Sequence, residues 1–186
     1  NRKTFQNWFN KTYASYRAKK NSMKSPSKGL GFDFFNHQKI VSDYINSESP
    51  FRGLLLFHGL GVGKTCAAIG IAECFTSGKE VVIMLNKSLK KNFIVNLMKC
   101  GFEYFRISQH WVYHTFRGES DNMLAYAKYL KVPAKIIKNG GAWFVDFSKP
   151  SNYDSLTIRQ HEQLNEQIDL MIKKKYTFIH LDGLNQ

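Results

Sequence analysis

A glycine-rich stretch in the first half of the chain has the residue types that bind a phosphate through the backbone. Gly59, Gly61 and Gly63 alternate with other residues, and Lys64 and Thr65 follow them. Glycines let successive backbone N–H groups point at one anion, and the first turn of a helix adds partial positive charge. Lys64 would reach the β- and γ-phosphates, and the Thr65 hydroxyl would ligate Mg²⁺. The spacing therefore predicts a loop that binds a nucleoside triphosphate.

Such a loop must be held between a strand and a helix. Residues 54–57 are four consecutive apolar residues, which predict a short buried strand of a parallel sheet. Residues 66–75 predict a helix whose N-terminus points at the phosphates. His58 replaces the first glycine of the usual pattern, at a position where many such loops vary. The alternative, a glycine-rich turn without nucleotide, gives no reason for Lys64, because a buried ammonium group needs an anion.

A helix predicted within residues 32–46 precedes this loop, with Asn36 as its N-cap. Gln38 lies in its first turn, and its carboxamide offers donors and an acceptor that match the hydrogen-bonding edge of adenine. The alternative is that Gln38 is an ordinary surface residue of the helix. The predicted nucleotide-contacting residues are Gln38, His58, Gly59, Leu60, Gly61, Val62, Gly63, Lys64, Thr65 and Cys66.

A second predicted strand, residues 80–85, ends in a basic loop that begins another helix. Ser88 is placed to cap this helix and Gly101 to end it. In an open parallel sheet the loops that follow the strands share one edge, where ligands bind. Cations and hydroxyl groups at a helix start suit a nucleic-acid backbone, whereas the alternative is a solvated basic helix start. The predicted nucleic-acid-binding residues are Asn86, Lys87, Ser88, Lys90 and Lys91.

The composition also favours a polyanionic partner. The 186 residues include 27 lysines and arginines against 14 acidic residues, for a net charge of +13. Nucleic acid is the first expectation and an anionic membrane surface the second, with a ligand-free basic surface as the alternative. No apolar run approaches the roughly 20 residues that span a bilayer. Three cysteines without a C-x-x-C pair are typical of a reduced intracellular protein without zinc.

The other elements follow from periodicity. Asp182 is expected to end an ordinary strand, although a strand that ends in aspartate also invites comparison with a Mg²⁺-holding Walker B strand. The aromatic stripe near the N-terminus is expected to pack on a neighbouring helix, with base stacking as the alternative. The predicted elements are helices at 4–20, 121–130 and 155–175, one or two strands within 104–116, and strands at 142–147 and 176–181.

Three stretches together carry a resemblance to a known family. They are residues 37–39 with 49–69, residues 81–93 and residues 174–185. They resemble the N-terminal ATPase lobe of superfamily 2 helicases of nucleocytoplasmic large DNA viruses, a group that includes the small subunit of the poxvirus early transcription factor. The likeness is sharp over 37–101 and 173–185. The family usually has proline where this chain has Asn86.

The resemblance implies a fold and an activity. Residues 32–186 would be the first RecA-like lobe of an ATP hydrolase, an α/β P-loop domain with a central, mainly parallel sheet flanked by helices and truncated before the Walker B motif. Residues 1–31 would add an N-terminal helix and a basic loop. The implied cofactors are ATP and Mg²⁺, and the implied partners are nucleic acid, DNA more than RNA, with a viral RNA polymerase or a second transcription-factor subunit. No membrane is implied, and the setting would be the virion and the cytoplasm of the infected cell.

Two other classes stay open at this point. One is a P-loop kinase or GTPase, although no guanine-reading Asn-Lys-x-Asp motif stands out. The other is a non-catalytic DNA-binding module that keeps nucleotide as a structural ligand. The family's catalytic carboxylates, coupling motif and arginine fingers have no counterpart in these residues. We therefore expect this chain alone to bind nucleotide weakly and to hydrolyse little.

Overall fold

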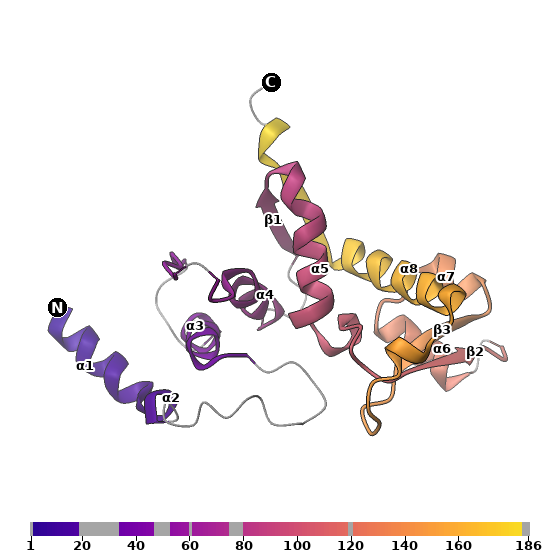
Figure 1. Ribbon diagram of the computed structural model, residues 1–186, viewed down its shortest axis with the longest axis horizontal. Helices are drawn as coiled ribbons and strands as arrows, with labels where there is room; N and C mark the ends of the chain where they lie inside the picture. The colour runs from indigo at the N-terminus through magenta and orange to yellow at the C-terminus, as the bar shows by residue number, and fades with distance from the viewer. Residues whose placement is uncertain are drawn as a thin grey trace. The chain divides into compact units, whose positions relative to one another are not determined.

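The computed structural model divides the chain into two compact units, each described here by itself (Figure 1). Among its described residues, the first unit has helices and no strand. The second unit contains helices and two small sheets. The described residues are 2–18, 34–46, 53–59 and 61–74 in the first unit, and 80–118 and 121–183 in the second.

Aromatic side chains hold the start of the first unit together. Helix α1 (Arg2–Thr12) places Phe5, Trp8 and Phe9 around Tyr44 of α3 (Asn36–Asn46), with ring centroids 6.2–6.4 Å from the Tyr44 ring. Tyr16 of α2 (Ala14–Ala18) donates a hydrogen bond to the Asp43 carboxylate of α3. The prediction that the aromatic stripe packs on a neighbouring helix is therefore confirmed.

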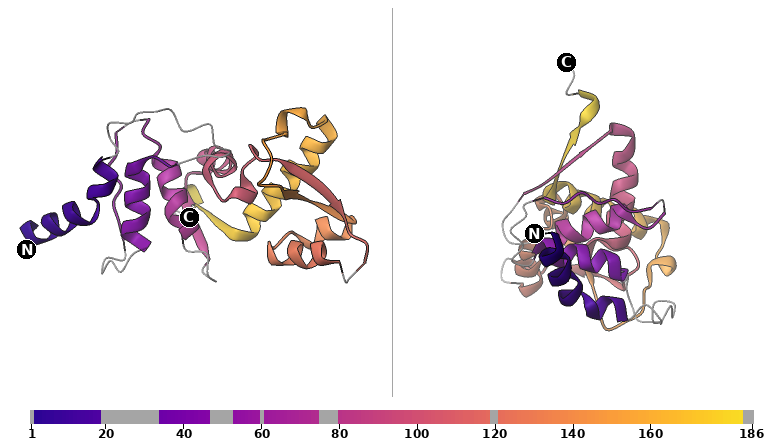
Figure 2. Two further views of the ribbon diagram at one scale, coloured as in Figure 1. Left: turned by 90° about the horizontal axis from the view of Figure 1, so that it is seen from below. Right: turned by 90° about the vertical axis from the view of Figure 1, so that its left-hand side faces the viewer.

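Helices α3 and α4 (Lys64–Cys74) pack side by side, as the two purple helices of Figure 2 show. The glycine at position 70 leaves room for the Phe34 ring, because an added Cβ would lie 3.1 Å from that ring. The Ser42 hydroxyl donates to the Gly70 carbonyl at 3.1 Å and lies 3.0 Å from the Cys74 sulfur. Helix α3 is thereby held against the helix that follows the glycine-rich loop.

The predicted strand at residues 54–57 is wrong in this structure. Residues 53–59 carry no ladder hydrogen bonds to any strand that the structure describes. Leu55 is 88% and Phe57 95% exposed. Four apolar residues make a buried strand only when neighbouring strands and helices cover both faces, and the first unit has no other described strand.

In the second unit, β1 (Val81–Leu85) pairs in parallel with β4 (Tyr176–His180), with Ile83 opposite Phe178. Helix α5 (Lys90–Cys100) covers one face, where Phe93 meets Phe178 edge-on at 6.1 Å. The opposite face, with Val82, Met84 and Ile179, is exposed. The predicted parallel pairing is thus present, but as two strands rather than as a broad central sheet.

A separate antiparallel pair lies at the other end of the second unit. Strand β2 (Trp111–Thr115) pairs with β3 (Gly141–Val145), and α6 (Asn122–Tyr129) and α7 (Ala134–Lys138) connect them. The Asp121 carboxylate caps α6 through the Met123 N–H. A hydrogen bond with His114, assisted by two backbone N–H groups, lowers the pKa of Asp121, so this cap stays charged.

Helix α8 (Ile158–Lys175) connects the two sheets and leads directly into β4 (Figure 1). Thr157 and Gln160 form its capping box, and Leu164, Ile168, Met171 and Ile172 are buried at the predicted spacing. The Gln167 carboxamide bonds both backbone groups of Trp143 at 2.8 Å. The remaining short helices are η2 (Lys87–Leu89), η3 (Glu103–Phe105), η4 (Tyr153–Ser155) and η5 (Leu181–Gly183).

The overall class is mixed α/β and mostly helical, with two-stranded sheets among the described residues. The α/β prediction holds at this coarse level. None of the described helices is both long and apolar enough to cross a lipid bilayer.

Candidate functional site

The glycine loop, residues 58–65, leads into the N-terminus of α4. Gly61 and Gly63 both have a φ of +79°, in the left-handed region that favours glycine. The Ala67 N–H donates to the Gly63 carbonyl at 3.0 Å, which starts the helical ladder of α4. The N–H groups of the residues before Ala67 have no acceptor within the helix. They make this helix start suitable for an anion.

Lys64 is the charged group of the loop. Its ammonium donates to the carbonyls of His58 at 3.1 Å and of Gly59 at 2.9 Å, and the side chain is exposed. Carbonyl oxygens are weak partners for a full positive charge compared with a phosphate oxygen. The ammonium therefore closes the loop while remaining available to a stronger anionic partner.

Helix α3 holds the loop from behind. The Gln38 carboxamide is buried; it donates to the Gly63 carbonyl at 2.9 Å and accepts from the Phe35 N–H at 2.9 Å. His37 adds a hydrogen bond to the Val62 carbonyl at 3.0 Å, and its ring lies edge-on to His58 at 5.3 Å. Gln38 thus anchors the loop, a role that the sequence reasoning missed.

The structure brings most of the predicted nucleotide-contacting residues together in the first unit. Thr65 and Cys66 are half-buried in the first turn of α4, and Val62 is exposed. His58 is half-buried, and its Nδ1 has no hydrogen-bond partner. Leu60 lies outside the described residues.

The predicted nucleic-acid-binding residues form the start of one helix in the second unit. Asn86, Lys87, Ser88 and Lys91 are exposed. Lys90 is half-buried, with its ammonium 5.0 Å from the centre of the Phe178 ring. We call this cluster, residues 86–91, the lysine turn.

Ser88 does not cap this helix. The helix begins one turn earlier as η2, with Asn86 at its N-cap position and no side-chain capping bond from it. Asp182 supplies the missing acceptor, because its carboxylate accepts from the Lys87 N–H at 2.9 Å. The carboxyl ends of β1 and β4 meet at one edge of the parallel pair, which brings Asp182 to the lysine turn.

Asp182 places a negative charge beside the lysine turn, where the sequence predicts contact with a nucleic-acid phosphate. We expect Asp182→Ala to raise the affinity for a single-stranded oligonucleotide about two- to fivefold, because a carboxylate at a helix N-terminus is worth roughly 0.3–1 kcal/mol. Asp154→Ala removes the same charge from η4 and serves as the control in a fluorescence-anisotropy titration. An equal rise in the oligonucleotide affinity of both variants would show that the effect comes from net charge and not from the position of Asp182.

Metal-binding clusters provide no further site. Among the residues that the structure describes, no group of three or more histidine, cysteine, aspartate or glutamate side chains could hold a metal ion.

Comparison with known proteins shows similarity to viral helicases. The chain is 34% identical over 111 residues to a predicted ATP-dependent RNA helicase of Acanthamoeba polyphaga mimivirus, a match that covers 56% of this chain and 19% of the relative. It is 38% identical over 80 residues to a second predicted RNA helicase of that virus, covering 40% of this chain and 7% of the relative. A predicted helicase of Frog virus 3 is 37% identical over 75 residues, covering 36% of this chain and 8% of the relative.

These matches span a minor part of each relative. The chain covers about a fifth or less of the length of each of these proteins. No family model matches the chain, and no solved structure matches it. The chain is therefore similar in part to helicases named in giant viruses and iridoviruses.

Proposed function

We propose that this chain is the ATP-binding lobe of a nucleic-acid-dependent ATPase of the helicase type from a large DNA virus. One observation carries the proposal. Two left-handed glycines precede Lys64 at the N-terminus of α4, an arrangement that suits the binding of a phosphate. The similarity to viral helicases supports the same class.

The residues of the glycine loop fit Mg²⁺-ATP. The backbone N–H groups at the start of α4 and the Lys64 ammonium would hold the phosphates, and the Thr65 hydroxyl would face the metal ion. Bound Mg²⁺ would neutralise phosphate charge. A second RecA-like lobe would complete hydrolysis.

The lysine turn is the proposed contact with the nucleic-acid backbone. Its exposed cations lie at a helix N-terminus, and the chain carries a net charge of +13. DNA is the proposed track. Because the two mimivirus relatives are named as RNA helicases, both polymers belong in the test.

A binding titration with both polymers tests this assignment. We expect the affinity for a single-stranded oligonucleotide to change at least about fivefold when a non-hydrolysable Mg²⁺-ATP analogue saturates the chain, because ligands of coupled sites shift each other's affinity. Lys87→Ala should make the slope of log affinity against log salt concentration shallower by about one. Lys99 is an exposed lysine later on α5, and Lys99→Ala should leave this slope unchanged. An unchanged affinity with and without the analogue would contradict the proposal.

Gln38 has two proposed roles that one variant can separate. We expect Gln38→Ala to lower the free energy of unfolding by about 2–3 kcal/mol, because two hydrogen bonds of a buried group are lost. If Gln38 also reads adenine, the variant loses the preference for ATP over GTP in competition titrations. Gln167→Ala removes an equally bonded buried glutamine from the second unit, and its ATP-to-GTP preference should stay that of the original chain.

The biological setting is part of the proposal. The resemblance over residues 37–101 and 173–185 favours a role in viral transcription, beside a viral RNA polymerase or a second transcription-factor subunit, in the virion and the infected cell's cytoplasm. Co-purification of this protein with the viral polymerase from infected cells would support that role. Its absence from purified polymerase complexes would count against it.

A further inference from the structure

Three aromatic rings in the second unit form a series from the core to the surface. Phe144 of β3 is 5% exposed, Tyr126 of α6 is 42% exposed and Tyr129 is 79% exposed. Tyr126 stacks on Phe144 at 5.7 Å with 26° between the planes, and Tyr129 stacks on Tyr126 at 6.4 Å with 16°. The series ends at a ring that is open to solvent.

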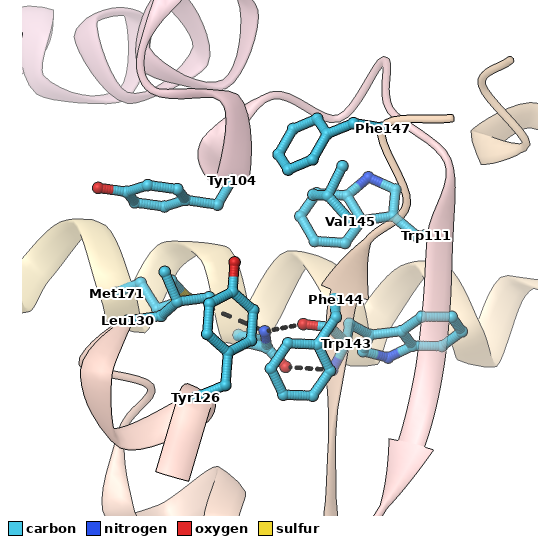
Figure 3. Close-up of a pocket in the computed structure, with 10 residues that line it drawn as sticks. Tyr104, Trp111, Tyr126, Leu130, Trp143, Phe144, Val145, Phe147 and Met171 are labelled. Carbon is cyan, nitrogen blue, oxygen red and sulfur yellow. Dashed lines mark hydrogen bonds between the residues drawn. The ribbon is translucent and has the colours of Figure 1, made fainter. Parts of the chain in front are cut away.

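The pocket beneath these rings does not provide an alternative site for a flat ligand. Figure 3 shows Tyr126, Phe144 and Met171 closing it on one side and Tyr104 and Phe147 on the other. The room inside is about 20 Å³. That volume holds one water molecule and is far too small for a base. A flat ligand would therefore stack on the surface, at Tyr129.

Exposed lysines flank Tyr129 in the sequence. Residues 121–141 include four lysines and one carboxylate. Lys128 precedes Tyr129 directly and Lys131 follows two residues later, and both side chains are exposed. Lys131 has a φ of +57°, which ends α6 in a tight left-handed turn. Neither lysine forms an ion pair with the carboxylates that the structure describes.

We propose that Tyr126 and Tyr129, the tyrosine pair of α6, stack with a base of single-stranded nucleic acid while Lys128 and Lys131 hold the adjoining phosphates. Stacking on an exposed ring with neighbouring cations is how proteins bind single strands without reading sequence. A protein partner fits less well, because lysine is depleted at protein–protein interfaces. The site lies on α6 and rests on the nucleic-acid binding proposed above, to which it adds a second contact outside the lysine turn.

Three variants of the 186-residue chain test the proposal. Tyr129→Ala removes the exposed ring, Tyr129→Phe keeps the ring without its hydroxyl, and Ile158→Ala removes an equally exposed apolar side chain from α8 (81% exposed). The fluorescent probes are 15-mers of deoxythymidine, of uridine and of an abasic sugar-phosphate backbone, titrated by anisotropy. The abasic probe keeps the phosphates and removes the bases.

We expect Tyr129→Ala to weaken binding of the thymidine or the uridine 15-mer at least about fivefold and to leave the abasic 15-mer unchanged. Tyr129→Phe and Ile158→Ala should bind like the original chain. The 15-mer whose binding weakens more shows whether the site prefers DNA or RNA. Circular dichroism spectra that overlay for the variants show that α6 remains folded.

Two results would overturn the inference. One is an equal loss for the abasic and base-carrying probes, since the ring would then not contact a base. The other is that Tyr129→Ala binds every probe as the original chain does while Lys87→Ala still weakens binding. The tyrosine pair would then not contact nucleic acid, and a protein would be its partner instead. If the original chain binds none of the probes, the proposed function fails together with this contact.

Discussion

Lys64→Ala should lower the affinity of the chain for Mg²⁺-ATP at least about tenfold, because a hydrogen bond from a charged group to phosphate is worth roughly 1.5–3 kcal/mol. The folded chain should tolerate the change. The ammonium is exposed, and its partners among the described residues are the carbonyls of His58 and Gly59. Competition of ATP against a fluorescent ATP analogue measures the loss.

A charge-matched control separates the phosphate contact from general attraction. Lys11→Ala removes one exposed positive charge from α1, in the same unit as the glycine loop. Its ATP affinity should stay within about twofold of the original chain, since exposed charges farther apart than about 10 Å are largely screened at 0.1 M salt. Equal losses in both variants would mean that Lys64 has no specific phosphate to bind.

Alanine at the three glycines of the loop should give three different stabilities. At Gly59 an added Cβ meets nothing within 4 Å and φ is not positive, so the free energy of unfolding should change by less than about 0.5 kcal/mol. At Gly61 the space is also open, but the φ of +79° should cost about 1–2 kcal/mol. Gly63→Ala should cost about 2–3 kcal/mol because strain and a clash combine there.

The clash at Gly63 involves the group that holds the loop. The added Cβ would lie 2.5 Å from the Gln38 Nε2, which donates to the Gly63 carbonyl. Gln38 is buried, so its displacement breaks both of its backbone hydrogen bonds. Urea denaturation of the three variants measures the order of their free energies of unfolding. Equal stabilities would contradict this geometry of the loop.

The sequence was most informative where local signals agreed. The helix predicted at residues 155–175 and the strand predicted at residues 176–181 are observed as α8 and β4. The helix predicted at residues 121–130 is observed as α6. Each of these features depends on neighbours within about one or two helical turns, which a sequence displays directly.

The features that depend on distant partners were missed. The apolar run at residues 54–57 lacks strand partners, and no property of the four residues themselves reveals this. Gln38 anchors a carbonyl 25 residues away, for which its residue type gave no signal. Asp182 could have been found, because the ends of parallel neighbouring strands share one edge and both strands were predicted.

The most direct test of the central claim is the rate of phosphate release from ATP with and without nucleic acid. The assay compares the original sequence with Lys64→Ala, in the 186-residue chain and in the longest reading frame that contains it, using single- and double-stranded DNA and RNA. We expect nucleic acid to stimulate hydrolysis by the longer form. We expect little hydrolysis by the 186-residue chain and none by Lys64→Ala. A rate that no nucleic acid changes, or that survives the loss of Lys64, would contradict it.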